Sequence, residues 1–387
     1  MPTIYLDNAA TTALEPRVFE AMLPFLKDHY GNASSIHQLG RQTNVAVEEA
    51  REKVAAAIGA EPSEIIFTSG GTESNNAVIK GVTDATGKKH IITSKIEHHA
   101  VLHPIQYGRK KGLRGTYLDI KPNGSVTAQQ VKDAIEDDTA LVSLMHVNNE
   151  IGSINPLKEI SAVCKEAGVA FHSDTVQSIG KLPVNVSEMG IDFLSISAHK
   201  IHGPKGIGAL YVKGGSRWKP WMEGGSQERR RRGGTLNVAG IAGLGEAVDI
   251  AVKERKKNMS HIKELSNRLV NGLREAFPDI LAFNGNPETG APNIVNCSFP
   301  LDPENALDGE MLLLNLDIEG ICVSNGSACT SGAVEASHVL TALGMVTPTA
   351  KSSIRFSLSK YNTTEEIDYT VSKLKGIITR MLKTSAV

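Results

Sequence analysis

The sequence predicts an α/β protein in which a large domain, built on a mostly parallel sheet, is followed by a smaller α+β domain. Short apolar runs alternate with helix-period segments up to about residue 240, and this alternation is typical of a parallel sheet covered by helices on both faces. A long charged helical stretch then begins, which indicates a second domain. The 387 residues are enough for two or three domains of roughly 100–200 residues each.

The candidate strands of the large domain are short runs rich in β-branched and other apolar residues. They occupy residues 64–70, 90–95, 140–147, 169–174, 192–198 and 207–212. Helices or turns are expected between them, at residues 72–82, 98–112, 156–168 and 175–180. Strands and helices in this order predict βαβ units, whose neighbouring strands run parallel.

The remaining segments predict the small domain. They are the helical stretch at residues 246–278, strands at 293–299, 320–324 and 352–359, and a closing helix at 364–383. We therefore expect three parts, with one boundary inside the long helical stretch. They are an N-terminal segment (residues 1–15) that packs with the small domain, a large domain (16–255) and a small C-terminal domain (256–387).

Composition and charge limit the classes of partner. The chain has 41 Lys and Arg against 42 Asp and Glu, a formal net charge of −1, so nothing in the overall balance attracts nucleic acid or an anionic membrane. The N-terminus lacks a basic region followed by an apolar stretch, and no run of about 18 apolar residues occurs. We expect a soluble cytoplasmic protein whose partners are small molecules or other proteins.

The four cysteines are expected to be free thiols. Cys164, Cys297, Cys322 and Cys329 form no CxxC pair, which argues against a disulfide framework and against a zinc ribbon. The first three lie in apolar helix or strand sequence and are explained by core packing. Cys329 lies instead in the small, polar, glycine-rich segment SNGSACTSG, which is typical of a mobile loop.

Polar residues gather where the predicted strands end, and ligands bind at the carboxyl ends of strands in an open α/β sheet. Lys200 directly follows an apolar run, next to the glycines of GPKGIG. The strand at 64–70 ends in two glycines before a helix opens at Thr72, and such a turn offers N–H groups and a hydroxyl to an anion. Asp174 and His98 follow two other strands. Taken singly, each residue also has a purely structural explanation.

Taken together, these residues match the needs of pyridoxal phosphate. That cofactor requires a lysine, an acid near its ring nitrogen, an anion site for its phosphate and a flat group over its ring. Lys200, Asp174, Thr72 and His98 supply these in order. A lysine in a crowded, partly apolar pocket has a lowered pKa and can form a Schiff base with an aldehyde. The alternative is a solvated loop lysine, as we assume for Lys205, and the strand and glycines that flank Lys200 argue against it.

The sequence resembles the NifS-like cysteine desulfurases, enzymes with the class V aminotransferase fold. The motifs that carry the resemblance span nearly the whole chain: YLDNAATT, YGNASSIH, FTSGGTESNN, EHHAV, HVNNEIG, FHSDTVQSIGK, SISAHKIHGPKGIGALYV, GGSQERRRRGGTLN, GSACTSG and SSIRFSLS. The resemblance implies the aspartate aminotransferase-like fold (fold type I) of pyridoxal phosphate enzymes. It also implies a homodimer with shared active sites.

The resemblance assigns roles residue by residue. Lys200 forms the Schiff base with the cofactor, Asp174 faces its pyridine nitrogen, and Gln177 bonds its ring hydroxyl. His98 stacks on the ring and moves protons. Asn149 contacts the cofactor and the substrate, and Arg355 binds the substrate carboxylate through two parallel hydrogen bonds. The phosphate ligands are Gly71, Thr72, Ser197, His199 and, from the neighbouring subunit, Thr235.

The same resemblance implies the reaction. It is closest to the subgroup with a long active-site loop and the sequence GSACTS, in which Cys329 receives sulfur from L-cysteine as a persulfide and L-alanine is released. The sulfur then passes to an acceptor protein, such as an iron–sulfur scaffold or a sulfur carrier. Two other functions stay open: a related enzyme such as a selenocysteine lyase or aminotransferase, and a non-catalytic adaptor for sulfur carriers.

Two further patterns raise the questions of RNA binding and of a metal site. The run Arg229 to Arg232 is interpreted as a local anion-binding or solvated patch, because the protein is neutral overall. His99 and His103 have helical i, i+4 spacing, but neither an HExxH motif nor a cysteine partner accompanies them. We expect no metal site.

Overall fold

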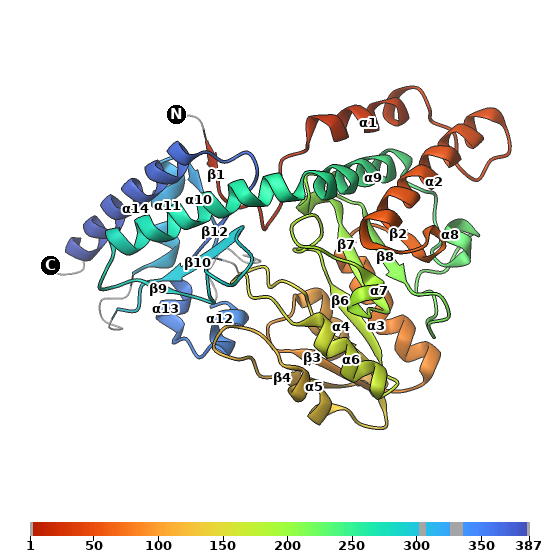
Figure 1. The fold of residues 1–387 in the computed structure, drawn as a ribbon, viewed down its shortest axis with the longest axis horizontal. Helices are drawn as coiled ribbons and strands as arrows, with labels where there is room; N and C mark the ends of the chain where they lie inside the picture. Colours follow the sequence, from red (N-terminus) through yellow and green to blue (C-terminus); the bar gives the residue numbers. More distant parts are fainter. Residues whose placement is uncertain (1–2, 302–306, 326–335, 385–387) are drawn as a thin grey trace.

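The computed structural model describes residues 3–301, 307–325 and 336–384. The chain forms a large domain and a small domain that lie side by side along the long axis of the molecule (Figure 1). Helices α9 (Val238–Lys253) and α10 (Arg255–Ala276) follow one another across both domains and meet at Glu254. The sequence predicted one helical stretch here, and the predicted domain boundary near residue 255 falls at this junction.

The large domain is built on a seven-stranded sheet with the order β2-β8-β7-β6-β5-β3-β4. Strand β8 runs antiparallel to both of its neighbours, whereas the other pairs are parallel. The predicted mostly parallel sheet is therefore confirmed. The strands are β2 (Ile65–Thr68), β3 (His90–Ser94), β4 (Arg114–Leu118), β5 (Thr139–Ser143), β6 (Ala170–Asp174), β7 (Phe193–Ser197) and β8 (Gly208–Val212).

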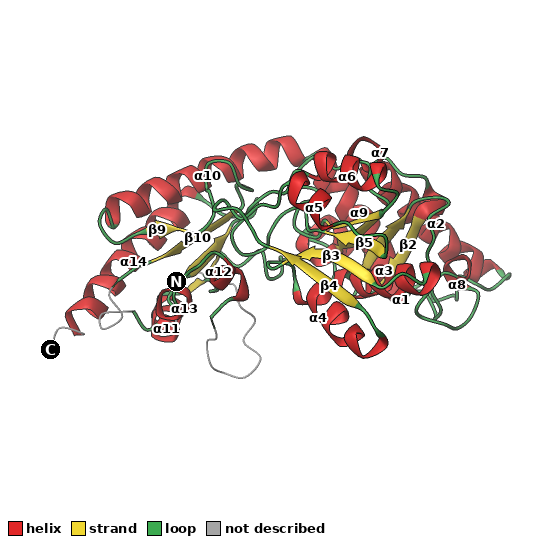
Figure 2. Ribbon diagram, turned by 90° about the horizontal axis from the view of Figure 1, so that it is seen from below, coloured by secondary structure: helices red, strands yellow, loops and turns green. Residues whose placement is uncertain are grey.

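Helices lie on both sides of this sheet, as Figure 2 shows. Successive strand residues point to opposite faces, so Ile91 and Ile92 of β3 enter different apolar clusters, one with α3 and α4 and the other with α2, α6 and α9. The remaining helical elements of the domain are α1 (Pro16–Lys27), α2 (Gln38–Ile58), η1 (Pro62–Glu64), α3 (Gly71–Thr86), α4 (His99–Gly108), η2 (Arg109–Lys111), α5 (Ala128–Ala134), α6 (Leu157–Glu166), α7 (Val186–Met189), η3 (Ala198–Lys200) and α8 (Gln227–Arg230).

The small domain packs three long helices on a short antiparallel sheet of order β12-β10-β9. Strand β1 (Ile4–Tyr5) pairs with β11 (Ile321–Cys322) beside it, and Ile4 and Leu6 join the small-domain core. This packing supports the division that we propose, with residues 1–15 belonging to the small domain. Its other elements are β9 (Ala282–Phe283), β10 (Ile294–Ser298), α11 (Gly309–Ile318), α12 (His338–Ala342), α13 (Thr347–Lys351), β12 (Ile354–Ser357) and α14 (Thr364–Thr384).

A buried ion pair ties the arginine-rich segment to the large domain. Glu228 binds the Arg51 guanidinium through two hydrogen bonds of 2.8 Å and accepts a third, also 2.8 Å, from the backbone N–H of Phe67. The backbone of Glu228 and of the next two residues is left-handed, with φ of 45°, 57° and 63°. This conformation costs free energy in residues other than glycine, so the buried contacts of Glu228 must hold it in place.

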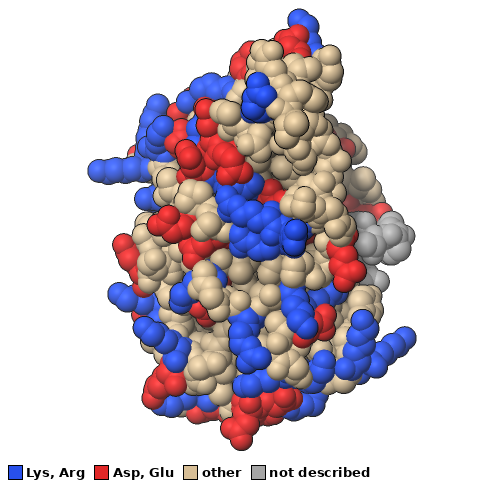
Figure 3. All heavy atoms as spheres, turned by 90° about the vertical axis from the view of Figure 1, so that its right-hand side faces the viewer, with Lys and Arg blue, Asp and Glu red and all other residues tan. Residues whose placement is uncertain are grey.

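The side chains of three of the four arginines after Glu228 have local partners. Arg229 pairs with Glu48 at 3.3 Å, Arg231 bonds the carbonyl of Ser63, and Arg232 pairs with Glu73 at 3.0 Å. Figure 3 shows Lys and Arg side chains gathered on the face of the molecule that carries α2 and α8. These pairs support the interpretation of the run as a local patch.

Arg51→Met should destabilise the protein strongly, because it leaves the Glu228 carboxylate buried without its cation. Loss of one partner of a buried ion pair costs about 3–5 kcal/mol, which chemical denaturation measures. The matched control is Arg268→Met, since the Arg268–Asp368 pair is half exposed on both sides and should contribute about 1 kcal/mol or less. Equal losses in the two variants would contradict this account.

Candidate active site

A cavity of about 690 Å³ opens at the carboxyl ends of the central strands, between the two domains. Side chains from both domains line it. Ten of the twelve residues that the sequence analysis assigned to the site line this cavity. They are Gly71, Thr72, His98, Asn149, Asp174, Gln177, Ser197, His199, Lys200 and Arg355. Thr235 does not line the cavity and is exposed, and Cys329 lies outside the described residues.

The amine of Lys200 is held by the N-terminal segment of the chain. Lys200 ends η3, directly after β7, and its Nζ donates hydrogen bonds of 2.6 Å to the carbonyls of Ala9 and Ala10. Burial, reinforced by the positive charge of Arg355, lowers the pKa of the amine to about 8. A substantial fraction of Lys200 is therefore neutral near physiological pH, as a nucleophilic lysine requires.

The carboxylate of Asp174, at the end of β6, is fixed by two donors. Its Oδ2 accepts from Nδ2 of Asn75 at 2.7 Å, and its Oδ1 accepts from the backbone N–H of Val176 at 3.0 Å. Asn75 is fully buried on α3, and its Oδ1 has no partner within the described residues. The sequence analysis quoted Asn75 only inside a motif, although a residue one helical turn after Gly71 faces the same strand ends.

His98 caps helix α4 and is held as a neutral ring. Its Nδ1 accepts from the backbone N–H of Ala100 at 3.0 Å, which leaves the ring proton on Nε2. Burial is the main cause that lowers the pKa of His98, and the nearby charge of Lys200 acts in the same direction. The ring can therefore donate or move a proton at Nε2.

The start of α3 and the end of β7 form a candidate anion site. Gly71 and Thr72 open the helix with free N–H groups, and the Ser197 hydroxyl and the His199 ring line the same cavity. A Cβ on Gly71 would lie 2.7 Å from Cγ2 of Val176, so only glycine fits there. Burial lowers the pKa of His199 to about 4, and its neutral ring contacts the Thr11 hydroxyl at 3.1 Å.

Arg355 enters the cavity from β12 and is already paired with a carboxylate of the chain. Its Nη2 donates to Asp7 at 2.7 Å and its Nη1 donates to the carbonyl of Asn149 at 3.0 Å. Its Nε is buried without a partner in the described part of the chain. Asp7 thus positions the guanidinium and offsets its charge, a role that the sequence analysis did not assign to it.

Further residues line the cavity without a role assigned by the sequence analysis, which considered His99 and His103 only as a possible metal site. The Glu150 carboxylate accepts a 2.5 Å hydrogen bond from Ser337, the residue that caps α12. The ring of His99 lies 4.6 Å, centroid to centroid, from the rings of His103 and of His338, stacked on the first and tilted by 39° to the second. Within residues 3–301, 307–325 and 336–384, no group of three or more His, Cys, Asp or Glu side chains is arranged to hold a metal ion.

The described thiols are poor nucleophiles. Burial raises the pKa of Cys164 and of Cys297 to about 12, and burial also raises the pKa of Cys322. A thiol rather than a thiolate therefore predominates at each of these positions, and the thiolate is the reactive form. Cys164 and Cys297 are buried in the core, as the sequence analysis expected, whereas Cys322 is only half-buried.

The residues of the cavity fit pyridoxal phosphate. One space contains an amine with a lowered pKa, a fixed carboxylate, a neutral imidazole and an anion site at a helix N-terminus. These are the groups that the cofactor needs for its aldehyde, ring nitrogen, ring face and phosphate. Two polar atoms at the cavity wall, Oδ1 of Asn75 and Nε of Arg355, have no hydrogen-bond partner among the described residues and can still form hydrogen bonds.

Comparison with known proteins identifies the family. Residues 4–370 match the family model described as Aminotransferase class-V. The cysteine desulfurase IscS of Dictyoglomus turgidum is 50% identical over 380 residues, which is 98% of this chain and 95% of that protein. Among solved structures, a NifS-like protein has a TM-score of 0.90 at 39% identity, covering 98% of this chain and 100% of that one. The structure of SspA in complex with cysteine has a TM-score of 0.80 at 36% identity, covering 93% and 100%.

The chain therefore belongs to the class V aminotransferase family. Within that family, the relatives named above include a cysteine desulfurase and NifS-like proteins. The predicted fold class, the resemblance to the NifS-like proteins and the predicted cysteine desulfurase activity are confirmed. The roles of the individual residues stay predictions.

Lys200 should react with aldehydes at a lower pH than an ordinary lysine. Because its neutral form increases as the pH rises through about 8, rather than through the ordinary value of 10.5, the rate of covalent capture of pyridoxal phosphate should reach half its maximum near pH 8. Borohydride reduction and peptide mapping at each pH measure this rate. Lys205→Ala, at an exposed position nearby, is the control and should change nothing. A midpoint near pH 10 on Lys200 would show the pKa shift to be wrong.

Proposed function

We propose that the enzyme uses pyridoxal phosphate to remove sulfur from L-cysteine, giving L-alanine and a persulfide on Cys329. The observation that carries this proposal is the meeting of Lys200, Asp174 and Arg355, from three separate parts of the chain, in one cavity. The likeness to SspA, whose structure was solved in complex with cysteine, supports the choice of substrate. An adaptor without catalysis would have no need to keep an amine with a lowered pKa beside a fixed carboxylate.

The bound cofactor would supply an electron sink next to the Cα atom of the substrate. Lys200 would hold the cofactor covalently and, once released as a free amine, take the proton from Cα. Asp174, oriented by Asn75, would keep a proton on the ring nitrogen through its negative charge. Asn75 needs no movement for this, since it already donates to the carboxylate.

Arg355 would bind the substrate carboxylate with the donors that Asp7 and Asn149 leave free. The unpaired Nε is one such donor. The thiolate of Cys329 would then attack the substrate sulfur, forming the S–S bond of the persulfide as the C–S bond breaks. His98 would move a proton at Nε2 during the release of alanine.

We also propose a class of sulfur acceptor and a cellular location for the protein. A persulfide is a carrier of transferable sulfur, so we propose an acceptor protein such as an iron–sulfur scaffold or a sulfur carrier. In the described parts of the chain, none of the helices combines the length and the apolar composition that crossing a bilayer requires. The cytoplasmic location and the lack of nucleic-acid binding remain predictions from the sequence.

Cys329→Ser should separate cofactor chemistry from sulfur transfer. The variant should keep the visible absorbance of the bound cofactor and still change it on addition of cysteine, yet release less than about one-hundredth of the wild-type sulfide, because the residue that accepts sulfur is missing. Sulfide release in the presence of reductant measures this.

The matched control is Cys297→Ser. It removes a thiol of high pKa in the small-domain core and should lower stability without lowering turnover per folded molecule. Wild-type sulfide release by Cys329→Ser would disprove the persulfide role, and failure of cysteine to change the cofactor spectrum of the wild-type protein would disprove the proposed reaction.

We also propose a homodimer whose cofactor sites are shared between subunits. Thr235 is exposed and lies outside the cavity of its own chain, which is compatible with the proposed contact to the phosphate of a neighbouring subunit. Helix α1 and the segment after it present Phe19, Leu26 and Tyr30 to solvent with 44%, 61% and 79% exposure. A two-fold dimer would cover such apolar side chains and create two equivalent sites.

Mixing inactive Lys200→Ala chains with Thr235→Ala chains should restore activity. In a mixed dimer one shared site would carry both lesions and the other none, so random mixing should recover about one quarter of the wild-type rate where Thr235→Ala alone is close to inactive. Sulfide release after denaturation and corefolding of the two variants measures this, with native mass spectrometry to count mixed dimers. If mixed dimers form and the rate equals the mean of the two parent dimers, Thr235 serves its own subunit.

A further inference from the structure

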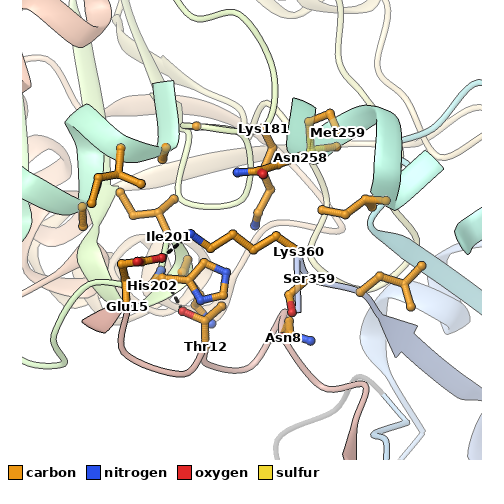
Figure 4. A pocket seen from close by; sticks show the side chains of 17 residues that line it. Asn8, Thr12, Glu15, Lys181, Ile201, His202, Asn258, Met259, Ser359 and Lys360 are labelled. Carbon is orange, nitrogen blue, oxygen red and sulfur yellow. Dashed lines mark hydrogen bonds and ion pairs between the residues drawn. The ribbon is translucent and has the colours of Figure 1, made fainter. Parts of the chain in front are cut away.

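A second, smaller cavity of about 50 Å³ lies next to Lys200 and is lined by residues of both domains. Lys200 lines both cavities. Figure 4 shows the small cavity between the two domains, with the side chains of Lys181 and Lys360 reaching into it from different elements. The presence of two long lysine side chains in so small a cavity calls for a structural explanation.

The two lysines have different surroundings. Lys360 is paired with the Glu15 carboxylate and lies 3.7 Å from that of Glu254, so its charge is offset locally. Lys181 instead contacts a neutral amide. Its Nζ donates a hydrogen bond to Oε1 of Gln177 at 3.1 Å. Burial, with the positive charge of Lys200, lowers the pKa of Lys181 to about 7. The Lys181 amine is thus removed from water, and its hydrogen bond is to a single glutamine side chain.

That glutamine lines the candidate active site, and two contacts fix the orientation of its amide. Nε2 of Gln177 donates to the carbonyl of Ala9 at 2.9 Å, while Oε1 accepts from Lys181. If the amide were turned over, its oxygen would meet the Ala9 oxygen and its NH₂ group would meet the amine of Lys181. The first contact would place two acceptors together, and the second would place two donors together whenever Lys181 is in its ammonium form, which has no lone pair.

The same carbonyl connects the glutamine to the reactive lysine. The Ala9 oxygen accepts from Nζ of Lys200 as well as from Nε2 of Gln177. A continuous series of hydrogen bonds therefore runs from Lys181 through Gln177 and Ala9 to Lys200. Hydrogen bonds in such a series depend on one another.

We propose that Lys181 is a positioning residue of the desulfurase reaction, which fixes the Gln177 amide so that its N–H edge, rather than its oxygen, is offered to the ring oxygen of the cofactor. The inference rests on the proposed function, because it assumes that Gln177 contacts pyridoxal phosphate. Nε2 has two hydrogens, and the Ala9 carbonyl uses one of them. The other remains for a ligand in the larger cavity.

Lys181→Met tests the proposal, since it keeps the length of the side chain and removes the donor. Without Lys181 the amide can turn over, and loss of one hydrogen bond should weaken binding of pyridoxal phosphate roughly three- to tenfold. The ring oxygen would also lose a donor that favours its anionic form. The pH midpoint of the visible absorption band of the bound cofactor should therefore move upward.

Lys360→Met is the matched control, because it removes a lysine of the same cavity that does not contact Gln177. It should lower thermal stability, by removing one of the two cations that pair with Glu15, but keep the wild-type cofactor affinity and band midpoint. Lys181→Arg keeps a pure donor and should restore the wild-type midpoint. Lys181→Gln, a polar variant for the case that Lys181→Met does not fold, can either donate or accept and should give a smaller upward shift.

Wild-type midpoint and affinity in both Lys181→Met and Lys181→Gln would overturn the proposal. Equal shifts in Lys181→Met and Lys360→Met would also overturn it, since the effect would then belong to the charge of the cavity and not to the glutamine. Failure of the wild-type protein to bind pyridoxal phosphate would instead refute the proposed function. The two failures are thus distinguishable before any turnover is measured.

Discussion

The site depends on the burial of one amine against the backbone of the N-terminal segment. Nζ of Lys200 has two carbonyls as partners, from Ala9 and Ala10, and no carboxylate bonds it directly among the described residues. Carbonyls satisfy an ammonium group less well than a carboxylate does, so desolvation dominates and the pKa falls. Had Asp7 turned to Lys200 instead of Arg355, the amine would have stayed charged.

Much of the fold was predictable because its signals are local. Each buried parallel strand is a short apolar run, and several site residues lie at the end of such a run or shortly after it, as Asp174 and Lys200 do. The structure differs where the local signal is weak. Strand β4 was not predicted, since its sequence RGTYL lies at the sheet edge and is mostly half-buried, without a continuous apolar run. Helices α1 and α2 were missed because α1 buries only Val18 and because the apolar positions of α2 are mostly small alanines and valines dispersed among charged residues.

The contacts that orient the site were not predictable because they join distant parts of the chain. Asp7 and Arg355 are 348 residues apart, and Asn75 and Asp174 are 99 apart. No spacing rule connects such pairs. Strand β11 shows the same limit, since it was predicted within the small domain but pairs with β1 at the opposite end of the sequence. Residues that touch the reacting atoms can be found from motifs, whereas the residues that hold them require the fold.

The N-terminal segment couples the reactive amine to the packing of both domains. It joins the small-domain core through Leu6, bonds Ser357 through Asn8 and holds Lys200 through Ala9. Local opening of this segment would therefore expose Lys200 to water and remove Leu6 from the small-domain core in the same event. The reactivity of the amine and the attachment of the small domain thus depend on one short stretch of backbone.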